Sequence, residues 1–104
     1  MYMQRVTIYP DPEKLADVRS MLSERAKARQ AAGIRLALSE MVAGGDAPQF
    51  TVSIVFDDLA AFEANRKRDQ ADGDFQKFVG KLSSSIRKPS DFDLLEVLVQ
   101  MPAR

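Results

Sequence analysis

The sequence predicts a single α+β domain in the order β-α-β-β-α-β, which defines the split β-α-β or ferredoxin-like arrangement. Apolar and polar side chains alternate with the period of two typical of half-buried strands in four segments: residues 4–9, 34–41, 49–56 and 92–100. Two longer segments, 12–32 and 58–86, repeat apolar side chains at helical spacing instead. At 104 residues the chain is long enough for one core but not for two, so one domain over residues 1–104 is expected.

The first strand, QRVTIY, ends at a proline and passes directly into a helix. Asp11 is a favourable N-cap and Pro12 suits the first helical position. The helix is expected to end near Ala32, with Gly33 as its C-terminal stop. The side chains that recur at helical spacing, and that should face the sheet, are Leu15, Val18, Leu22 and Ala26.

The next two strands, IRLALSEM (34–41) and QFTVSIVF (49–56), flank a turn rich in glycine at residues 43–48. Two alternating strands around a Gly-Gly turn predict a β-hairpin. Asp57 and Asp58 can then cap the second helix, which stops at an Asp-Gly-Asp break over residues 72–74. A second apolar stripe follows, consisting of Phe75, Phe78, Val79, Leu82 and Ile86. Lys88-Pro89-Ser90 is expected to end that helix before the last strand, residues 92–100.

The two faces of the predicted sheet differ in composition. One is almost wholly apolar and should lie under the helices; it consists of Val6, Ile8, Leu36, Leu38, Val52, Ile54, Leu95, Val97 and Val99. The other mixes apolar with polar side chains and would leave too much apolar surface in water on a monomer. We therefore expect a homodimer in which this face meets a partner sheet, with Arg5, Tyr9, Ser53, Val55, Leu94, Glu96 and Leu98 in the interface. Arg5 and Glu96 are expected on neighbouring strands, where they could pair.

Composition excludes several classes of function. The 15 basic side chains balance 15 acidic ones, which argues against a nucleic-acid or membrane-surface partner. Histidine and cysteine are both absent, so neither haem nor a transition-metal site is expected, and no cofactor is predicted. The N-terminus is too short and polar for a signal peptide, and no apolar run reaches the length of a membrane span. A cytoplasmic protein is therefore expected.

Three side chains are candidates for ligand binding. Arg29 falls within the apolar stripe of the first helix. Its side chain either extends past the helix end into solvent, pairs with a carboxylate such as Glu24 or Glu40, or faces a cavity and anchors an anionic ligand. Arg66 either belongs to a solvated charged face or lies at a pocket mouth. Tyr9 is either interface packing or a phenolic proton donor near the first helix.

The stretches VSIVF, FDDLAAFEANRKRDQ and DGDFQKFVGKL carry a family resemblance. The chain resembles the dimeric α/β-barrel superfamily of ferredoxin-like domains, in particular its antibiotic-biosynthesis-monooxygenase-like and NIPSNAP-like members. The resemblance implies sheet-to-sheet dimers and explains the interrupted helix as one crossover folded around the sheet edge. Relatives that degrade haem use a histidine ligand, which this chain lacks.

Two functional interpretations follow from that resemblance. The first is a small-molecule binder, with the resemblance implying a cofactor-independent monooxygenase whose substrate supplies the reducing power. The second is a non-catalytic dimeric module for ligand sensing or protein association. An enclosed cavity reached by Arg29 or Arg66 favours the first, and a filled helix–sheet interface favours the second.

Overall fold

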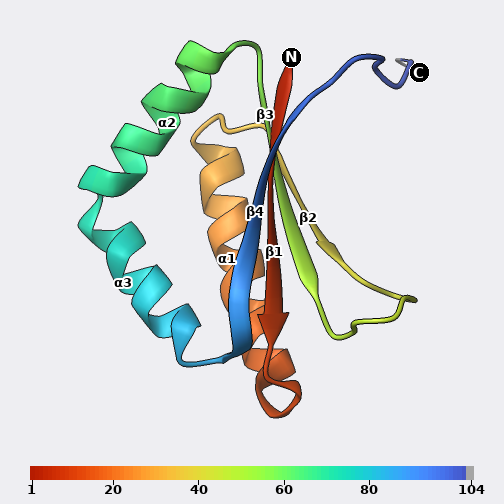
Figure 1. The fold of residues 1–104 in the computed structure, drawn as a ribbon. Helices are drawn as coiled ribbons and strands as arrows, with labels where there is room; N and C mark the ends of the chain where they lie inside the picture. The colour runs from red at the N-terminus through yellow and green to blue at the C-terminus, as the bar shows by residue number, and fades with distance from the viewer. Residues whose placement is uncertain (103–104) are drawn as a thin grey trace.

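The computed structural model describes residues 1–102 and contains one four-stranded sheet with three helices (Figure 1). The elements are β1 (Tyr2–Pro10), α1 (Leu15–Ala31), β2 (Leu36–Glu40), β3 (Phe50–Phe56), α2 (Leu59–Ala71), α3 (Gly73–Ser83) and β4 (Ile86–Glu96). A short 3-10 turn, Pro12–Lys14, leads into α1. The strands lie in the order β2-β3-β1-β4 with every neighbouring pair antiparallel, which confirms the predicted ferredoxin-like topology.

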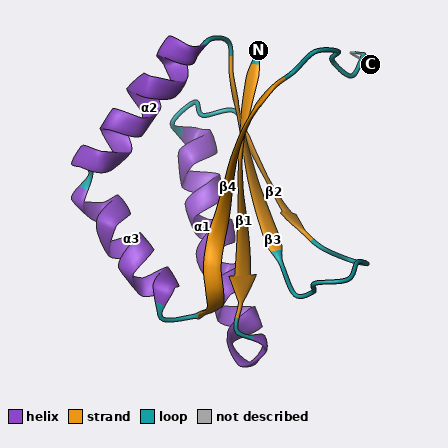
Figure 2. Ribbon diagram, viewed as in Figure 1, coloured by secondary structure: helices purple, strands orange, loops and turns teal. Residues whose placement is uncertain are grey.

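All three helices lie on one side of the sheet (Figure 2). The other face carries no helix from residues 1–102; the β2–β3 loop and the segment that follows β4 bend toward that side (Figure 2). No helix in this described range is both long and apolar enough to cross a membrane. We call the two sides of the sheet the helix face and the outer face.

The helix interruption predicted from the sequence is confirmed and consists of a single residue. Asp72 adopts an extended conformation, with φ −90° and ψ 110°, between the last residue of α2 and the first of α3. Its side chain accepts a hydrogen bond from the Asp74 backbone N–H at 2.9 Å and so caps α3. Asp58 caps α2 in the same way, by accepting from Ala61 N–H at 2.8 Å. The break therefore ends one helix and starts the next with its own cap.

The core lies between α1 and the helix face. Val18 and Leu22 of the predicted inward stripe are buried there, together with Ile8 and Phe50 of the sheet and Leu82 of α3. A second cluster under α2 consists of Ile54, Phe56 and Phe62. The side chains of these two clusters alternate along the strands as the sequence predicted.

The last strand begins and ends earlier than predicted. β4 starts at Ile86, which was assigned to the helix stripe, and stops at Glu96 rather than at residue 100. Pro89 was expected to terminate the preceding helix, yet it lies within the strand. β4 is an edge strand, so one of its two sides has no neighbouring strand. On that open side a proline removes no hydrogen bond between strands, because no partner strand is there to accept it.

The phase of β4 is also opposite to the prediction. Val6 of β1 pairs with Phe92, Gln4 with Leu94 and Tyr2 with Glu96, so these β4 side chains share the helix face. Leu95 pairs with Met3 and lies on the outer face instead. The placement of Leu94 and Glu96 on the outer face, and of Leu95 on the helix face, was therefore wrong.

Arg5 accordingly has a different partner from the one predicted. Its guanidinium lies 3.4 Å from the Asp93 carboxylate, while Glu96 is on the other side of the sheet. Leu98 lies beyond the end of β4 and is 86% exposed. The outer face therefore keeps Arg5, Tyr9, Ser53 and Val55 from the expected interface set.

Candidate functional site

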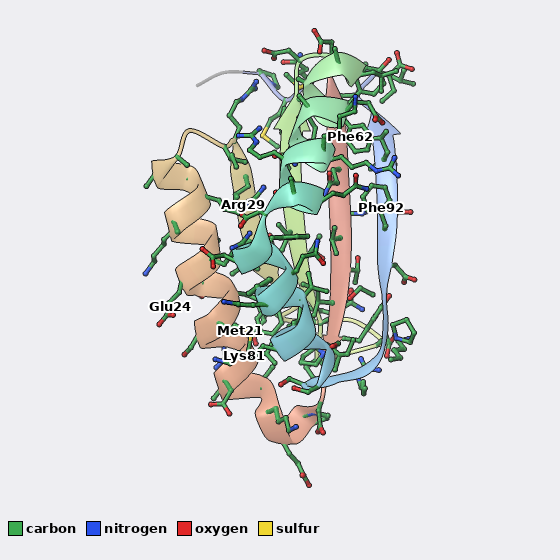
Figure 3. All side chains as sticks on the ribbon, turned by 90° about the vertical axis from the view of Figure 1, so that its left-hand side faces the viewer. Met21, Glu24, Arg29, Phe62, Lys81 and Phe92 are labelled. Atoms are coloured by element: carbon green, nitrogen blue, oxygen red, sulfur yellow. The ribbon has the colours of Figure 1, made fainter. Side chains whose placement is uncertain are left out.

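A pocket of about 490 Å³ lies between the α2–α3 pair and the strands β1 and β4. Its apolar lining comes from Val6, Phe62, Phe75 and Phe92, and its polar lining from Gln4, Asn65, Arg66, Asp69 and Gln70. Figure 3 shows why space remains here: β4 runs beside the α2–α3 pair rather than beneath it, with Phe92 at that side. The volume falls within the range that small-molecule sites occupy.

Three aromatic rings make the pocket walls planar and apolar. Phe62 is buried, and its ring centroid lies 6.4 Å from that of Phe92 at an interplanar angle of 47°. Phe92 is 56% exposed, which places it at the open side. The Phe75 ring is held by Arg25 of α1, whose guanidinium carbon lies 5.2 Å from the ring centroid. Such walls suit a flat apolar or aromatic molecule.

Arg29 reaches from the last turn of α1 to α2 (Figure 3). It donates to the two carboxylate oxygens of Asp69 at 3.0 and 3.3 Å, and to Asn65 Oδ1 at 3.3 Å. The partner in the chain is thus Asp69 rather than either carboxylate expected from the sequence, and Glu40 pairs with Arg19 instead. Arg29 does not itself line the pocket, but both of its partners do.

Asn65 is the most deeply buried polar side chain in the described range, at 3% exposure. Its oxygen accepts from Arg29, and its amide nitrogen has no hydrogen-bond partner within residues 1–102. That nitrogen is also not sealed from solvent, because no fully enclosed side-chain nitrogen or oxygen in this range is left unpaired. Asn65 is therefore a buried residue with one remaining donor group.

Arg66 follows Asn65 on α2, and it combines both of its predicted positions. The side chain lines the pocket and is still 59% exposed. Its nearest carboxylate is Glu63, at 3.7 Å, which is a loose surface pair that contributes little. A positive charge therefore lies at the pocket mouth.

The sequence model of the NIPSNAP family matches residues 6–95, which is most of the chain and includes every pocket residue except Gln4. The chain belongs to the NIPSNAP family. No curated protein matches it in sequence.

Solved structures share the fold of this NIPSNAP chain. A NIPSNAP domain protein from Burkholderia xenovorans is 16% identical with a TM-score of 0.80, and the alignment covers 99% of this chain and 100% of that one. A NIPSNAP family protein from Agrobacterium tumefaciens is 20% identical with a TM-score of 0.79, covering 99% and 98%. An antibiotic biosynthesis monooxygenase is 18% identical with a TM-score of 0.71, covering 95% and 100%. At these identities the likeness establishes the fold alone.

Tyr9, the third predicted ligand-binding residue, does not line the pocket of this NIPSNAP chain. It lies on the outer face, where its hydroxyl donates to Asp91 Oδ2 and Lys88 lies 4.1 Å from the ring centroid. The hydrogen bond to the Asp91 carboxylate, together with burial, raises the pKa of the Tyr9 phenol above its ordinary value of 10.0. Tyr9 is thus kept as a neutral phenol that supports the β4 side of the outer face.

Sequence reasoning missed Asn65 and Asp69 as site residues. Both belong to the same helix face as Phe62, because they follow it by three and seven residues. An amide and a carboxylate on the buried face of a helix require partners or a cavity, and this signal was present in the sequence. Phe92 was missed because β4 was placed in the opposite phase.

Proposed function

We propose that this NIPSNAP chain binds a small planar aromatic or otherwise apolar molecule with an anionic group, and that it does so as a homodimer. The pocket carries the proposal: it combines three aromatic walls with a single mouth arginine. An aromatic ring system would stack against Phe62 and Phe92, and its anionic group would lie near Arg66.

The three residues expected to bind the ligand take different parts in this proposal. Arg66 would contact the anionic group directly, because it lines the pocket and is only loosely held by Glu63. Arg29 would act through the two pocket residues to which it is bonded. Tyr9 would contribute to the dimer interface.

Homodimerisation is supported by the composition of the outer face. Met3, Val55 and Leu95 give it apolar surface that no helix from residues 1–102 covers. The polar side chains Arg5 and Ser53 lie among them, as in an interface between two sheets. The residues beyond β4, with Leu98 86% and Val99 88% exposed, provide further apolar surface for a second copy.

The family resemblance implies a cofactor-independent oxygenation, and we take this as the reaction to test; the chain shares its fold with an antibiotic biosynthesis monooxygenase. In such a reaction one atom of O2 enters the substrate and the other leaves as water, with the substrate supplying the electrons. An activated methylene flanked by two aryl groups meets this balance, because CH2 and O2 give a ketone and water. The apolar walls would exclude water from the reacting carbon.

The non-catalytic alternative is favoured by the state of the acidic group in the pocket. Asp69 is the one carboxylate among the lining residues in the described range, and it is engaged by Arg29. Both of its oxygens already accept hydrogen bonds from the Arg29 guanidinium. Ligand sensing without chemistry would need no general base.

The binding proposal is tested by titrating the dimer with 2-naphthoate. Binding is measured by calorimetry or by the intrinsic fluorescence of the protein, which has no tryptophan contribution because the sequence contains no tryptophan. We expect saturable binding that Arg66→Gln weakens about tenfold, since one charge-assisted contact is lost. Lys67→Gln is the matched control, because Lys67 is the next residue on α2 and does not line the pocket. No saturable binding to the wild type, or equal weakening by both variants, would contradict the proposal.

The reaction is tested separately with anthrone under ¹⁸O2. Incorporation of one labelled atom into the ketone, at a rate that Phe92→Ser lowers, would support oxygenation. Binding without any turnover above the uncatalysed rate would favour the sensing module. The cytoplasmic location expected from the sequence remains a prediction, which cell fractionation would test.

A further inference from the structure

We infer that Arg29 and Asp69 fix the Asn65 amide so that its N–H2 group points into the pocket and selects ligands carrying a hydrogen-bond acceptor. This inference rests on the proposed function, because it concerns which ligand the same pocket accepts. It assigns Arg29 as a positioning residue that acts through Asn65.

The orientation of the amide follows from the chemistry of Arg29. A guanidinium only donates hydrogen bonds, so the atom of Asn65 that meets Arg29 Nη2 at 3.3 Å must be the oxygen. The amide nitrogen is then on the other branch of the planar group. Rotation of the amide by half a turn would bring two donors together and leave Asn65 at 3% exposure without its bond to Arg29.

Arg29 itself is held in place by Asp69. The two carboxylate oxygens accept from both terminal nitrogens of the guanidinium, at 3.0 and 3.3 Å, which fixes the plane of the fork. Both side chains are largely buried, at 16% and 17% exposure. The hydrogen bonds from Arg29 to Asp69 and to Asn65 therefore determine the position of the amide before any ligand binds.

The position of Arg29 also determines which hollow the nitrogen faces. Asn65 lines both the ligand pocket and a smaller hollow of about 220 Å³, and the smaller hollow is lined on the α1 side by residues that directly follow the helix, such as Ala32 and Gly33. Arg29 draws the oxygen toward α1, so the nitrogen points away from α1. In Figure 3 the side of α2 opposite Arg29 is the side of Phe62 and Phe92. The ligand pocket lies on that side.

The pocket accordingly presents a fixed neutral donor beside its aromatic walls. A carbonyl, phenolate or carboxylate oxygen on the edge of a flat ring system would pair with it. A ring system of the same shape without an acceptor would leave the amide nitrogen desolvated and unpaired. Selectivity of this kind is independent of ligand charge, which separates it from the contribution of Arg66.

The test uses two neutral tricyclic probes of nearly equal shape, 9-fluorenone with one carbonyl acceptor and fluorene with none. Their dissociation constants are measured on the dimer by NMR titration, and the readout is the ratio between them. We expect the wild type to prefer fluorenone about tenfold. Asn65→Asp, which keeps the shape and replaces the donor with an acceptor, should bring the ratio to one or below. Gln76→Glu, at an exposed amide of α3 that does not line the pocket, should leave it unchanged.

The role of Arg29 is tested in the double variant Arg29→Met/Asp69→Leu. This variant removes both charges together, so neither side chain is left without its ion-pair partner. The amide is then free to rotate, so the ratio should fall toward one even if both probes bind with altered affinity. A purely structural role would change both affinities equally and keep the ratio. If the wild type binds both probes equally, the inference is overturned while the pocket function stands. If it binds neither probe, the inference is overturned, and the titration with 2-naphthoate decides the pocket function separately.

Discussion

Arg29 on α1 and Asp69 on α2 are 40 residues apart in the chain and meet as a two-point ion pair with distances of 3.0 and 3.3 Å. The pair ties together two helices that are separated in sequence by the β-hairpin, and its Asp69 side chain lines the pocket. Such a pair both stabilises the helix layer and shapes the site. Its removal should therefore be visible in stability as well as in binding.

We expect Arg29→Met to lower the free energy of unfolding by about 2–3 kcal/mol, because it leaves the largely buried Asp69 carboxylate without its donor. The methionine keeps an unbranched apolar stem, so packing changes little. Urea denaturation monitored by circular dichroism measures the loss.

The double variant Arg29→Met/Asp69→Leu should lose less than Arg29→Met alone, because no charge is then stranded. The matched surface control is Arg35→Met. Arg35 pairs with Asp57, but these side chains are 56% and 82% exposed, so the expected loss is below about 0.5 kcal/mol. Equal losses at Arg29 and Arg35 would show that burial of the Arg29 pair adds nothing.

The topology was predictable because strands and helices differ in period, and the caps and turns mark their ends. The phase of β4 was not, because Leu94 and Leu95 are consecutive and the run continues through Val97 and Val99. Either phase of such a run presents apolar side chains to the core. The pairing of Val6 with Phe92 decides between them, and that pairing depends on a contact across the sheet.

The candidate site was predictable only in part, for a related reason. The position of Arg29 on the apolar stripe indicated that its charge needs a partner or a ligand. The identity of that partner depends on how α2 packs beside α1, which no local pattern contains. Asp69 could be recognised as a partner only once α2 was placed.

Tyr9 gives a prediction at alkaline pH. The hydrogen bond to Asp91 and burial raise the phenol pKa, so the folded protein holds this proton more firmly than the unfolded chain does. The resulting stability is fully present below pH 10 and is lost as the pH rises through the folded pKa.

The measurement uses a Tyr2→Phe background, because Tyr2 and Tyr9 are the two tyrosines of the sequence. Phenolate absorbance near 295 nm should then titrate above the ordinary tyrosine value, and Asp91→Asn should shift the midpoint down. A midpoint at or below 10 with Asp91 intact would contradict the hydrogen bond seen here.

The break between α2 and α3 should depend on Asp72 rather than on the glycine that follows. Asp72→Ala removes the side-chain cap on Asp74 N–H and should cost about 1 kcal/mol. Gly73→Ala should instead raise stability by about 0.5 kcal/mol. Gly73 has no positive φ, and an added Cβ meets nothing within 4 Å. Thermal melts of the two variants should shift in opposite directions, and a loss of stability in Gly73→Ala would show that the break needs glycine itself.

The outer face gives the prediction on assembly. Val55 lies on this face opposite Met3 of β1 and is only half-buried within one chain. In a sheet-to-sheet homodimer it would be covered by the partner, in an interface well above about 1,000 Å² in total. We expect light scattering at micromolar concentration to give twice the 11.6 kDa of one chain, and Val55→Glu to give a folded monomer, because a carboxylate would be buried there without a partner. Val79→Glu is the matched control, since Val79 is 41% exposed on α3, on the opposite side of the molecule from the outer face. A monomeric wild type would contradict the homodimer. A Val55→Glu variant that stays dimeric with an unchanged circular dichroism spectrum would show that the dimer contact lies elsewhere.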